Sequence, residues 1–191
     1  MTVRPGHARS RTETRLRLLA TAVCVVVLTL SVPRAPSQIQ DERTVKAAFV
    51  FNLTKYVEWP EPAARLTVGV VGTGPMSDAL QKILNGKISD GRPIIVLLLH
   101  SEDQVQQCHI VFVATAAHPL RPMLDRIRDR PVLTVSDTDG FAQHGGMVGL
   151  VRQGDQIQLQ VNLQAAQEAH LRISSRLLSL STIVRSSGGE Q

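Results

Sequence analysis

Cysteine, aromatic residues and long apolar runs are all scarce in this chain of 191 residues. It has two cysteines, Cys24 and Cys108, and no C-x-x-C pair, so the ligand spacing of a structural zinc site is missing. No G-x-S-x-G sequence occurs, so the nucleophile turn of an α/β-hydrolase is missing as well. The apolar run 18–32 is shorter than the roughly 20 residues of a membrane-spanning helix. The sequence is therefore not that of a disulfide-rich scaffold or a zinc ribbon.

Excess positive charge is confined to the amino-terminal segment. Residues 1–37 contain six Arg and one Glu, whereas residues 38–191 contain 15 basic and 15 acidic side chains. Binding to a phosphate backbone depends on an excess of basic side chains, and the main part of the chain has none. We therefore expect no nucleic-acid partner.

Residues 1–37 have the layout of an export signal and a short linker. Five arginines precede the apolar run, and Ala35-Pro36-Ser37 offers small residues after it. The sequence predicts a secretory signal, with an uncleaved amino-terminal anchor as the alternative, and a linker over residues 33–40. We expect one domain over residues 38–185 and a disordered tail over 186–191. Only Cys108 remains once the signal is removed, either as a buried thiol or as a partner for an intermolecular disulfide.

Apolar runs alternate with helical patterns along the predicted domain. The patterns indicate helices over 41–57, 75–84, 119–128, 163–171 and 174–184, and strands over 66–71, 93–99, 108–114, 132–136, 147–152 and 156–162. Gln153-Gly154-Asp155 joins the last two strands as a hairpin. Strand 93–99 is apolar on both faces, as is typical of an interior strand. The fold class is therefore α/β: a mixed, mostly parallel sheet flanked by helices, with a C-terminal β-hairpin and closing helices.

Aromatic residues gather in one short segment. Four of the six, Phe49, Phe51, Tyr56 and Trp59, fall within eleven positions. Packing of the first helix on the sheet would explain them. The functional alternative is an exposed second face that meets another protein, because aromatic side chains bury a large area at little entropic cost. We hypothesise partner contacts through Phe51, Tyr56 and Trp59, with Phe141 behind a later glycine-rich turn.

Polar and glycine residues follow three of the predicted strands. In open α/β sheets, ligands bind at the carboxyl ends of strands. The residues at these ends, which we take as candidate ligand-binding positions, are Gly72, Thr73, Gly74, Thr115, Ser136 and Asp137. Gly72-Thr73-Gly74 lacks the third glycine of a dinucleotide-binding G-x-G-x-x-G, so we expect no such cofactor.

Catalytic and metal-binding constellations are weak in this sequence. Ser136, Asp137, Asp139 and His144 include the residue types of a hydrolase triad, but adjacency in sequence does not supply triad geometry, and a structural turn also explains them. His100, Cys108, His109 and His118 are the residue types of a metal site. Cys108 and His109, however, would point to opposite faces of one strand. We expect no metal, no cofactor and no enzymatic activity.

Four sequence blocks resemble the YfiR family of bacterial proteins. They are VKAAFVFNLTKYVEWP (45–60), LTVGVVGTGPMSDAL (66–80), CHIVFVA (108–114), and VLTVSDTDGFAQHGGMVGLV with IQLQVNLQAAQEAHLRISSRLLSL behind it (132–180). The blocks occur in order and cover nearly the whole chain beyond the export segment.

The resemblance implies a periplasmic repressor. Such a protein holds an inner-membrane diguanylate cyclase inactive by engaging its periplasmic sensor domain, which lowers cyclic di-GMP and biofilm formation, and an outer-membrane lipoprotein can sequester it. We expect a homodimer. Some relatives carry a disulfide that uses the position of Cys108, but no second cysteine lies beyond residue 37 here, so redox control through such a bridge is not expected. The alternative function is a periplasmic small-ligand-binding sensor.

Overall fold

A computed structural model describes residues 37–114 and 120–187 of the chain. The residues from Gln38 onward form one compact unit. Residues 1–36 of the predicted export segment and Thr115 lie outside the described residues, as do residues 188–191 of the predicted tail.

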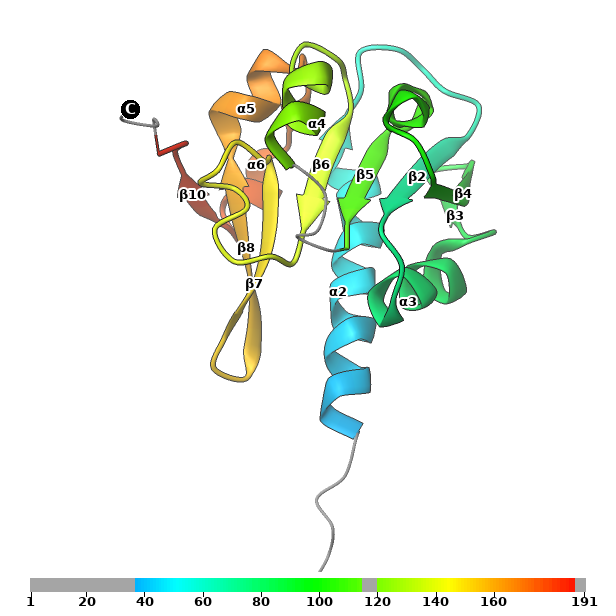
Figure 1. Ribbon diagram of the computed structural model, residues 1–191, viewed down its shortest axis with the longest axis vertical. Coiled ribbons are helices and arrows are strands. Elements are labelled where there is room, and N and C mark those ends of the chain that lie inside the picture. Colours follow the sequence, from blue (N-terminus) through cyan, green and yellow to red (C-terminus); the bar gives the residue numbers. More distant parts are fainter. Residues whose placement is uncertain (1–36, 115–119, 188–191) are drawn as a thin grey trace, which may run out of the picture. The chain divides into compact units, whose positions relative to one another are not determined.

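An eight-stranded sheet forms the centre of this unit, in the order β10-β8-β7-β6-β5-β2-β4-β3 (Figure 1). The strands are β2 (Leu66–Val71), β3 (Ile88–Ser89), β4 (Arg92–Leu99), β5 (Ile110–Val113), β6 (Leu133–Ser136), β7 (Val148–Gln153), β8 (Gln156–Asn162) and β10 (Thr182–Val184). β4, β2, β5, β6 and β7 run parallel, whereas β3 and β8 are antiparallel to their partners β4 and β7. The predicted mixed, mostly parallel sheet with a terminal hairpin is confirmed.

Helices cover both faces of the sheet. They are α2 (Ser37–Tyr56), α3 (Pro75–Leu84), α4 (Leu120–Ile127), α5 (Leu163–Glu168), α6 (Ser175–Leu178) and the 3-10 helix η1 (Glu102–Gln107). Figure 1 shows α2 behind the sheet and α4 in front of it. Leu53 of α2 belongs to the same core cluster as Phe112 of β5, while Ile127 of α4 belongs to a second cluster with Val111. Adjacent residues of β5 thus feed opposite cores, as the alternation of a strand dictates.

The first helix is longer at its start than the sequence pattern predicts. It begins at Ser37, so residues 37–40 of the predicted linker are helical, and it ends at Tyr56, before Trp59-Pro60. The next two residues form β1 (Val57–Glu58), which pairs with β9 (Arg172–Ile173) in a separate two-stranded sheet. Strands of two residues carry no periodicity, which is why the sequence pattern does not reveal them.

The predicted closing helix 174–184 is wrong. Only Ser175–Leu178 is helical, capped by the Ser174 hydroxyl, which accepts a hydrogen bond from Leu177 N at 3.3 Å. The chain then enters β10, whose three residues pair in parallel with β8. Thr182, Ile183 and Val184 are all β-branched, and such side chains favour strands over helices.

Strand 93–99 is interior as predicted, but the coverage of both its faces is only partial. β4 lies between β2 and the two-residue edge strand β3, which pairs only with its beginning. Leu97 and Leu98 are consequently exposed. An apolar run on both faces therefore does not guarantee that a strand is covered on both faces.

The first two residues of the predicted tail make hydrogen bonds with the domain. The Ser186 hydroxyl accepts from Asn162 Nδ2 at 2.8 Å, and Ser187 N donates to the carbonyl oxygen of Gln143 at 2.9 Å. These bonds hold the chain after β10 against the end of β8 and the loop that precedes β7.

Candidate functional site

The carboxyl ends of β2, β5 and β6 meet at one edge of the sheet. Val71 pairs with Val113, and Val113 pairs with Ser136. The structure therefore brings the turn 72–74 and Ser136-Asp137 to a common edge, as a ligand site at the strand ends requires.

The turn after β2 is built on two glycines with left-handed backbone. Gly72 has φ 94° and Gly74 has φ 139°, conformations that side chains with a Cβ rarely adopt. Thr73 between them is exposed, and Pro75 starts α3 directly afterwards. The turn thus reverses the chain from β2 into α3 and presents Thr73 at the surface.

Ser136 and Asp137 are engaged in internal contacts. The Ser136 hydroxyl is buried, donates to the carbonyl oxygen of Val113 at 2.8 Å, and accepts from Thr138 N at 3.1 Å. Asp137 Oδ2 lies 2.9 Å from the ammonium group of Lys46. Both residues therefore hold the end of β6 in place, and a ligand would have to displace these bonds.

A cluster of four charged side chains joins α2 to the sheet, and the sequence analysis missed it. Lys46, only 8 % exposed, lies 2.8 Å from Glu42 and 2.9 Å from Asp137, and Arg152 of β7 lies 3.0 Å from Glu42. The spacing of four between Glu42 and Lys46 is a visible helical signal. Asp137 is 91 positions from Lys46, and no local pattern links the two.

The charges in this cluster stabilise one another. Burial lowers the pKa of Lys46, but hydrogen bonds to Glu42 and Asp137 outweigh it, so the pKa is raised overall. The hydrogen bond from Lys46 lowers the pKa of Glu42 against the opposing effect of burial, and Arg152 adds to the lowering. The ammonium group and the Glu42 carboxylate are therefore both ionised at neutral pH.

The residues with triad chemistry are not arranged as a triad. The Ser136 hydroxyl is bonded to backbone, and His144 Nδ1 lies 2.7 Å from the carbonyl oxygen of Gly140 on the exposed side of the loop. No hydrogen bond joins Ser136 to His144 within residues 37–114 and 120–187. Over the same ranges no three His, Cys, Asp or Glu side chains gather as a metal site would require, and His118 lies outside them.

Trp59 is anchored at the opposite, amino-terminal edge of the sheet. Its indole N–H donates to the carbonyl oxygen of His109 at 3.1 Å, and the two rings meet edge-on with centroids 5.9 Å apart. His109 Nδ1 in turn accepts from Thr67 N at 3.2 Å. Burial, with a smaller contribution from Arg92, lowers the pKa of His109, which keeps the ring neutral for this contact.

Phe51 and Tyr56 lie on the same carboxyl-terminal part of α2 and are half-buried. The Lys55 ammonium sits 4.8 Å from the centroid of the Phe51 ring. The carbonyl oxygen of Tyr56 accepts from Ser174 N at 2.9 Å, next to the β1–β9 pair. Phe51, Tyr56 and Trp59 thus combine core packing with exposed ring surface at one end of the domain.

Phe141 is separate from these three aromatic residues. Its side chain is 1 % exposed, belongs to the second core cluster with Leu124 and Ile127, and lies against the backbone of Gly146. The ring fixes the glycine-rich turn from inside and leaves no surface for a partner in this arrangement.

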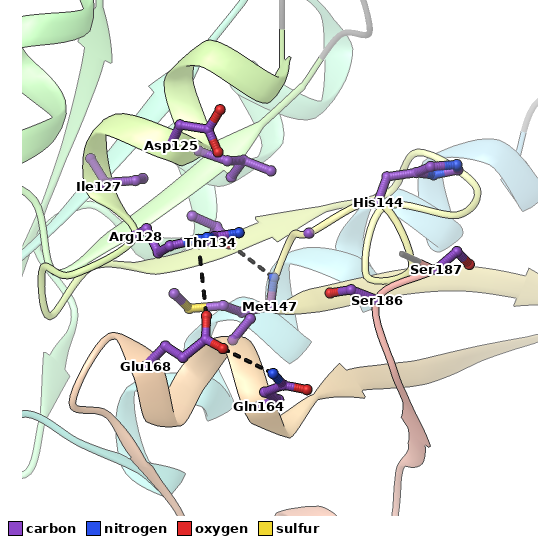
Figure 2. Close-up of a pocket in the computed structure, with 13 residues that line it drawn as sticks. Asp125, Ile127, Arg128, Thr134, His144, Met147, Gln164, Glu168, Ser186 and Ser187 are labelled. Atoms are coloured by element: carbon purple, nitrogen blue, oxygen red, sulfur yellow. Dashed lines mark hydrogen bonds and ion pairs between the residues drawn. The ribbon is translucent and has the colours of Figure 1, made fainter. Parts of the chain in front are cut away.

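A pocket of about 550 Å³ lies between α4, α5 and the loop before β7, away from the predicted ligand residues (Figure 2). Figure 2 shows Arg128, which directly follows α4, facing Glu168 of α5. Arg128 Nε lies 3.9 Å from Glu168 Oε2, and Gln164 Nε2 donates to Glu168 Oε1 at 3.0 Å. Thr134 and Met147 lie on the sheet between the two helices. The volume falls within the range of about 300–1,000 Å³ that small-molecule sites occupy.

A second hollow of about 580 Å³ lies between the beginning of α2 and the β7–β8 hairpin. Val45, Phe49 and Ile157 provide its apolar surface, with Glu42 and Arg152 beside them. Phe49 therefore faces a different side of α2 from Phe51, because two residues along a helix are about 200° apart.

Comparison with known protein families decides which group of proteins this is. A sequence model of YfiR/HmsC-like proteins matches residues 43–182, from α2 to the first residue of β10. The chain belongs to the YfiR/HmsC-like family. The match spans the charged cluster except Glu42, the aromatic segment and all residues of both strand-end turns. No curated protein matches the chain significantly.

Membership of the YfiR/HmsC-like family implies a regulatory, non-catalytic protein of the periplasm that acts on cyclic di-GMP signalling. Among the helices that the structure describes, none is both long and apolar enough to cross a bilayer.

Proposed function

We propose that this protein binds the periplasmic sensor domain of an inner-membrane diguanylate cyclase and holds the enzyme inactive. The match to the YfiR/HmsC-like family over residues 43–182 carries this proposal. Inhibition lowers cyclic di-GMP and with it biofilm formation. An outer-membrane lipoprotein that binds the same protein releases the cyclase.

The aromatic end of the domain is the proposed contact surface. Phe51, Tyr56 and Trp59 are half-buried, so each ring is held by the core while part of it faces outward. Trp59 is further fixed by its hydrogen bond to His109. Side chains that are already immobilised lose little entropy on binding, which favours them as interface anchors.

Inhibition needs no chemistry on the part of the inhibitor. A protein that binds the inactive state of a receptor more tightly than the active state shifts the receptor toward the inactive state. The size of the shift is limited by the difference between the two affinities.

Deleting the gene tests this function directly. Cellular cyclic di-GMP, measured by mass spectrometry, should rise, and restoring the gene should bring it back. The protein should also copurify with a membrane diguanylate cyclase after crosslinking of intact cells. Unchanged cyclic di-GMP together with the absence of a cyclase among the crosslinked proteins contradicts the proposal.

Replacing Phe51 with Ala tests the contact surface. We expect Phe51→Ala to weaken copurification of the cyclase at least tenfold, because a central aromatic anchor contributes more than about 1.4 kcal/mol to such interfaces. Phe49→Ala is the matched control, since Phe49 is also half-buried on α2 but lines the hollow near the hairpin. Equal weakening by both variants, at equal thermal stability, would place the contact elsewhere.

The alternative function is a periplasmic small-ligand sensor, and the pocket between α4 and α5 favours it. The pocket joins an apolar floor to the Arg128–Glu168 pair, which gives it both shape and polarity. Amino acids, nucleotides and sugars can be screened by thermal shift and by the fluorescence of Trp59, the single tryptophan. A saturable shift that Arg128→Ala abolishes supports the sensor, whereas flat titrations throughout contradict it.

A further inference from the structure

His109 lies between the indole ring of Trp59 and the backbone of the sheet. Its carbonyl oxygen accepts from Trp59 Nε1 at 3.1 Å and from Leu133 N at 2.8 Å. Its imidazole ring meets the indole ring edge-on, and its Nδ1 accepts from Thr67 N at 3.2 Å. His109 therefore contacts Trp59 through both its backbone and its side chain.

The hydrogen bond from Thr67 requires a neutral His109 ring. An imidazole nitrogen accepts a hydrogen bond only while it carries no proton, so the single ring proton is on Nε2. A proton added to Nδ1 would face the N–H of Thr67, and two donors cannot share a hydrogen bond. The observed position of the ring is therefore incompatible with its charged form.

The surroundings of the His109 ring also disfavour a positive charge. Burial lowers the pKa of the ring, and the like charge of Arg92, at the start of β4, lowers it further. The neighbouring Cys108 belongs to the second core cluster, and burial raises the pKa of its thiol to about 11, so it stays neutral. Glu58, next to Trp59, lies 3.6 Å from Arg172 instead. Among residues 37–114 and 120–187, no carboxylate forms an ion pair with His109.

We propose that His109 is a positioning residue for Trp59, and that protonation turns the His109 ring away from Trp59, so that acid weakens binding to the receptor. This inference rests on the proposed function, because it concerns the same contact surface. Part of the half-buried indole faces outward. An anchor that is immobile before binding loses less entropy than a mobile one. Freeing the indole therefore lowers the affinity although no contact residue has changed.

The size of the effect follows from the fraction of neutral rings. Histidine is the side chain whose charge changes most readily between neutral and mildly acidic pH. If only the neutral form holds Trp59 in place, the apparent dissociation constant rises as the neutral fraction falls. One pH unit below the midpoint about a tenth of the rings are neutral, which weakens binding about tenfold. Acid would then release the cyclase and raise cyclic di-GMP.

The fluorescence of Trp59, the single tryptophan, tests the positioning role on the purified full chain without a receptor. From about pH 8 to about pH 4.5 the emission should shift in one transition, with a midpoint below the ordinary histidine pKa of about 6.5. Far-ultraviolet circular dichroism should stay constant over this range. His109→Gln should abolish the transition, because its amide oxygen can accept from Thr67 N but does not titrate.

His144→Gln is the matched control for this titration. It replaces an exposed histidine in the loop before β7, bonded to the carbonyl oxygen of Gly140, and should keep the transition. The proposal is overturned if the parent chain shows no transition, or if the transition persists in His109→Gln. A transition accompanied by loss of circular dichroism also overturns it, because Trp59 then reports unfolding.

Crosslinking of intact cells measures the effect on binding. A photo-activated crosslinker is used at neutral pH and again one unit below the fluorescence midpoint. The yield of copurified cyclase should fall about tenfold between the two in the parent chain, and less than about twofold in His109→Gln. An equal fall in both chains overturns the role of His109. Absence of the cyclase at neutral pH, with a fluorescence transition that depends on His109, contradicts the receptor instead and supports the positioning of Trp59.

Discussion

At the scale of single residues, Gly146 and Phe141 show how a short turn is fixed from inside. The Phe141 ring is buried against Gly146, and a Cβ added at that glycine would overlap the ring. At Gly146 the missing side chain therefore provides space for a neighbouring ring. A partner contact through Phe141 requires an exposed ring. Whether that ring is exposed depends on packing between residues far apart in the sequence.

Gly146→Ala should destabilise the domain by about 1–3 kcal/mol, because an extra methyl group forces the Phe141 ring or the backbone to move. Urea unfolding followed by circular dichroism measures the loss. Gly149→Ala is the control, since a Cβ there meets only Gln160 and Val151 at ordinary distances of 3.6–3.7 Å. A loss of the same size in both variants would mean that overlap with Phe141 is not the cause.

At the scale of elements, the sequence predicts the central strands and α3 well, and the ends of the chain less well. The pattern predicts strand 66–71 and helix 75–84 with the bounds that the structure has, because a compact apolar run and a Pro-started amphipathic turn are both local signals. The helix predicted over 174–184 includes the residues of β10. Pairing with β8, which lies some 20 residues earlier, decides the outcome there.

The functional residues divide in the same way, into those that a local pattern predicts and those that only long-range contacts bring together. The sequence predicts that the turns after β2 and β6 lie at one edge of the sheet, and the parallel register confirms this placement. The sequence also identifies the aromatic segment with Phe51, Tyr56 and Trp59. The pocket between α4 and α5 and the charged cluster around Lys46 escape it, because each depends on side chains far apart in the chain meeting in space.

Asn85 provides a test of how β4 is covered beyond β3, where Asn85 Oδ1 accepts from Val96 N at 3.1 Å. Asn85→Ala should cost about 1–2 kcal/mol, because the buried N–H of Val96 loses its acceptor. It should also make the protein more prone to aggregate, since part of the β4 edge becomes free. Urea unfolding and light scattering measure the two effects. Asn52→Ala on the exposed side of α2 should change neither, and a matching loss in that control would contradict the explanation.

At the scale of the whole molecule, the Lys46 cluster ties three distant parts of the chain together. Glu42 and Lys46 come from α2, Asp137 from the end of β6, and Arg152 from the hairpin. The folded pKa of Glu42 lies below its unfolded value, so its contribution to stability is complete above the unfolded pKa and is lost as pH falls through the folded pKa. The folded pKa of Lys46 lies above its unfolded value, so its contribution is complete below the unfolded pKa and is lost as pH rises through the folded pKa.

Lys46→Met should lower the free energy of unfolding by about 2–3 kcal/mol at neutral pH, because two carboxylates lose their shared cation. The difference from the parent should shrink as acid protonates Glu42, whose lowered pKa places this loss below the ordinary range of a glutamate. Urea unfolding across this pH range measures both effects. Lys82→Met, on the exposed side of α3, should change stability by less than about 0.5 kcal/mol. A pH-independent loss in Lys46→Met would mean that packing, and not charge, is responsible.

The length of α2 keeps the two ends of the domain apart. Glu42 beside the hollow and Tyr56 at the end of the helix are fourteen residues apart, which is about 21 Å along the helix axis. If the proposed receptor docks on the aromatic rings, the hairpin end stays free of that contact. A second protein would then reach the hollow beside the hairpin without first displacing the receptor.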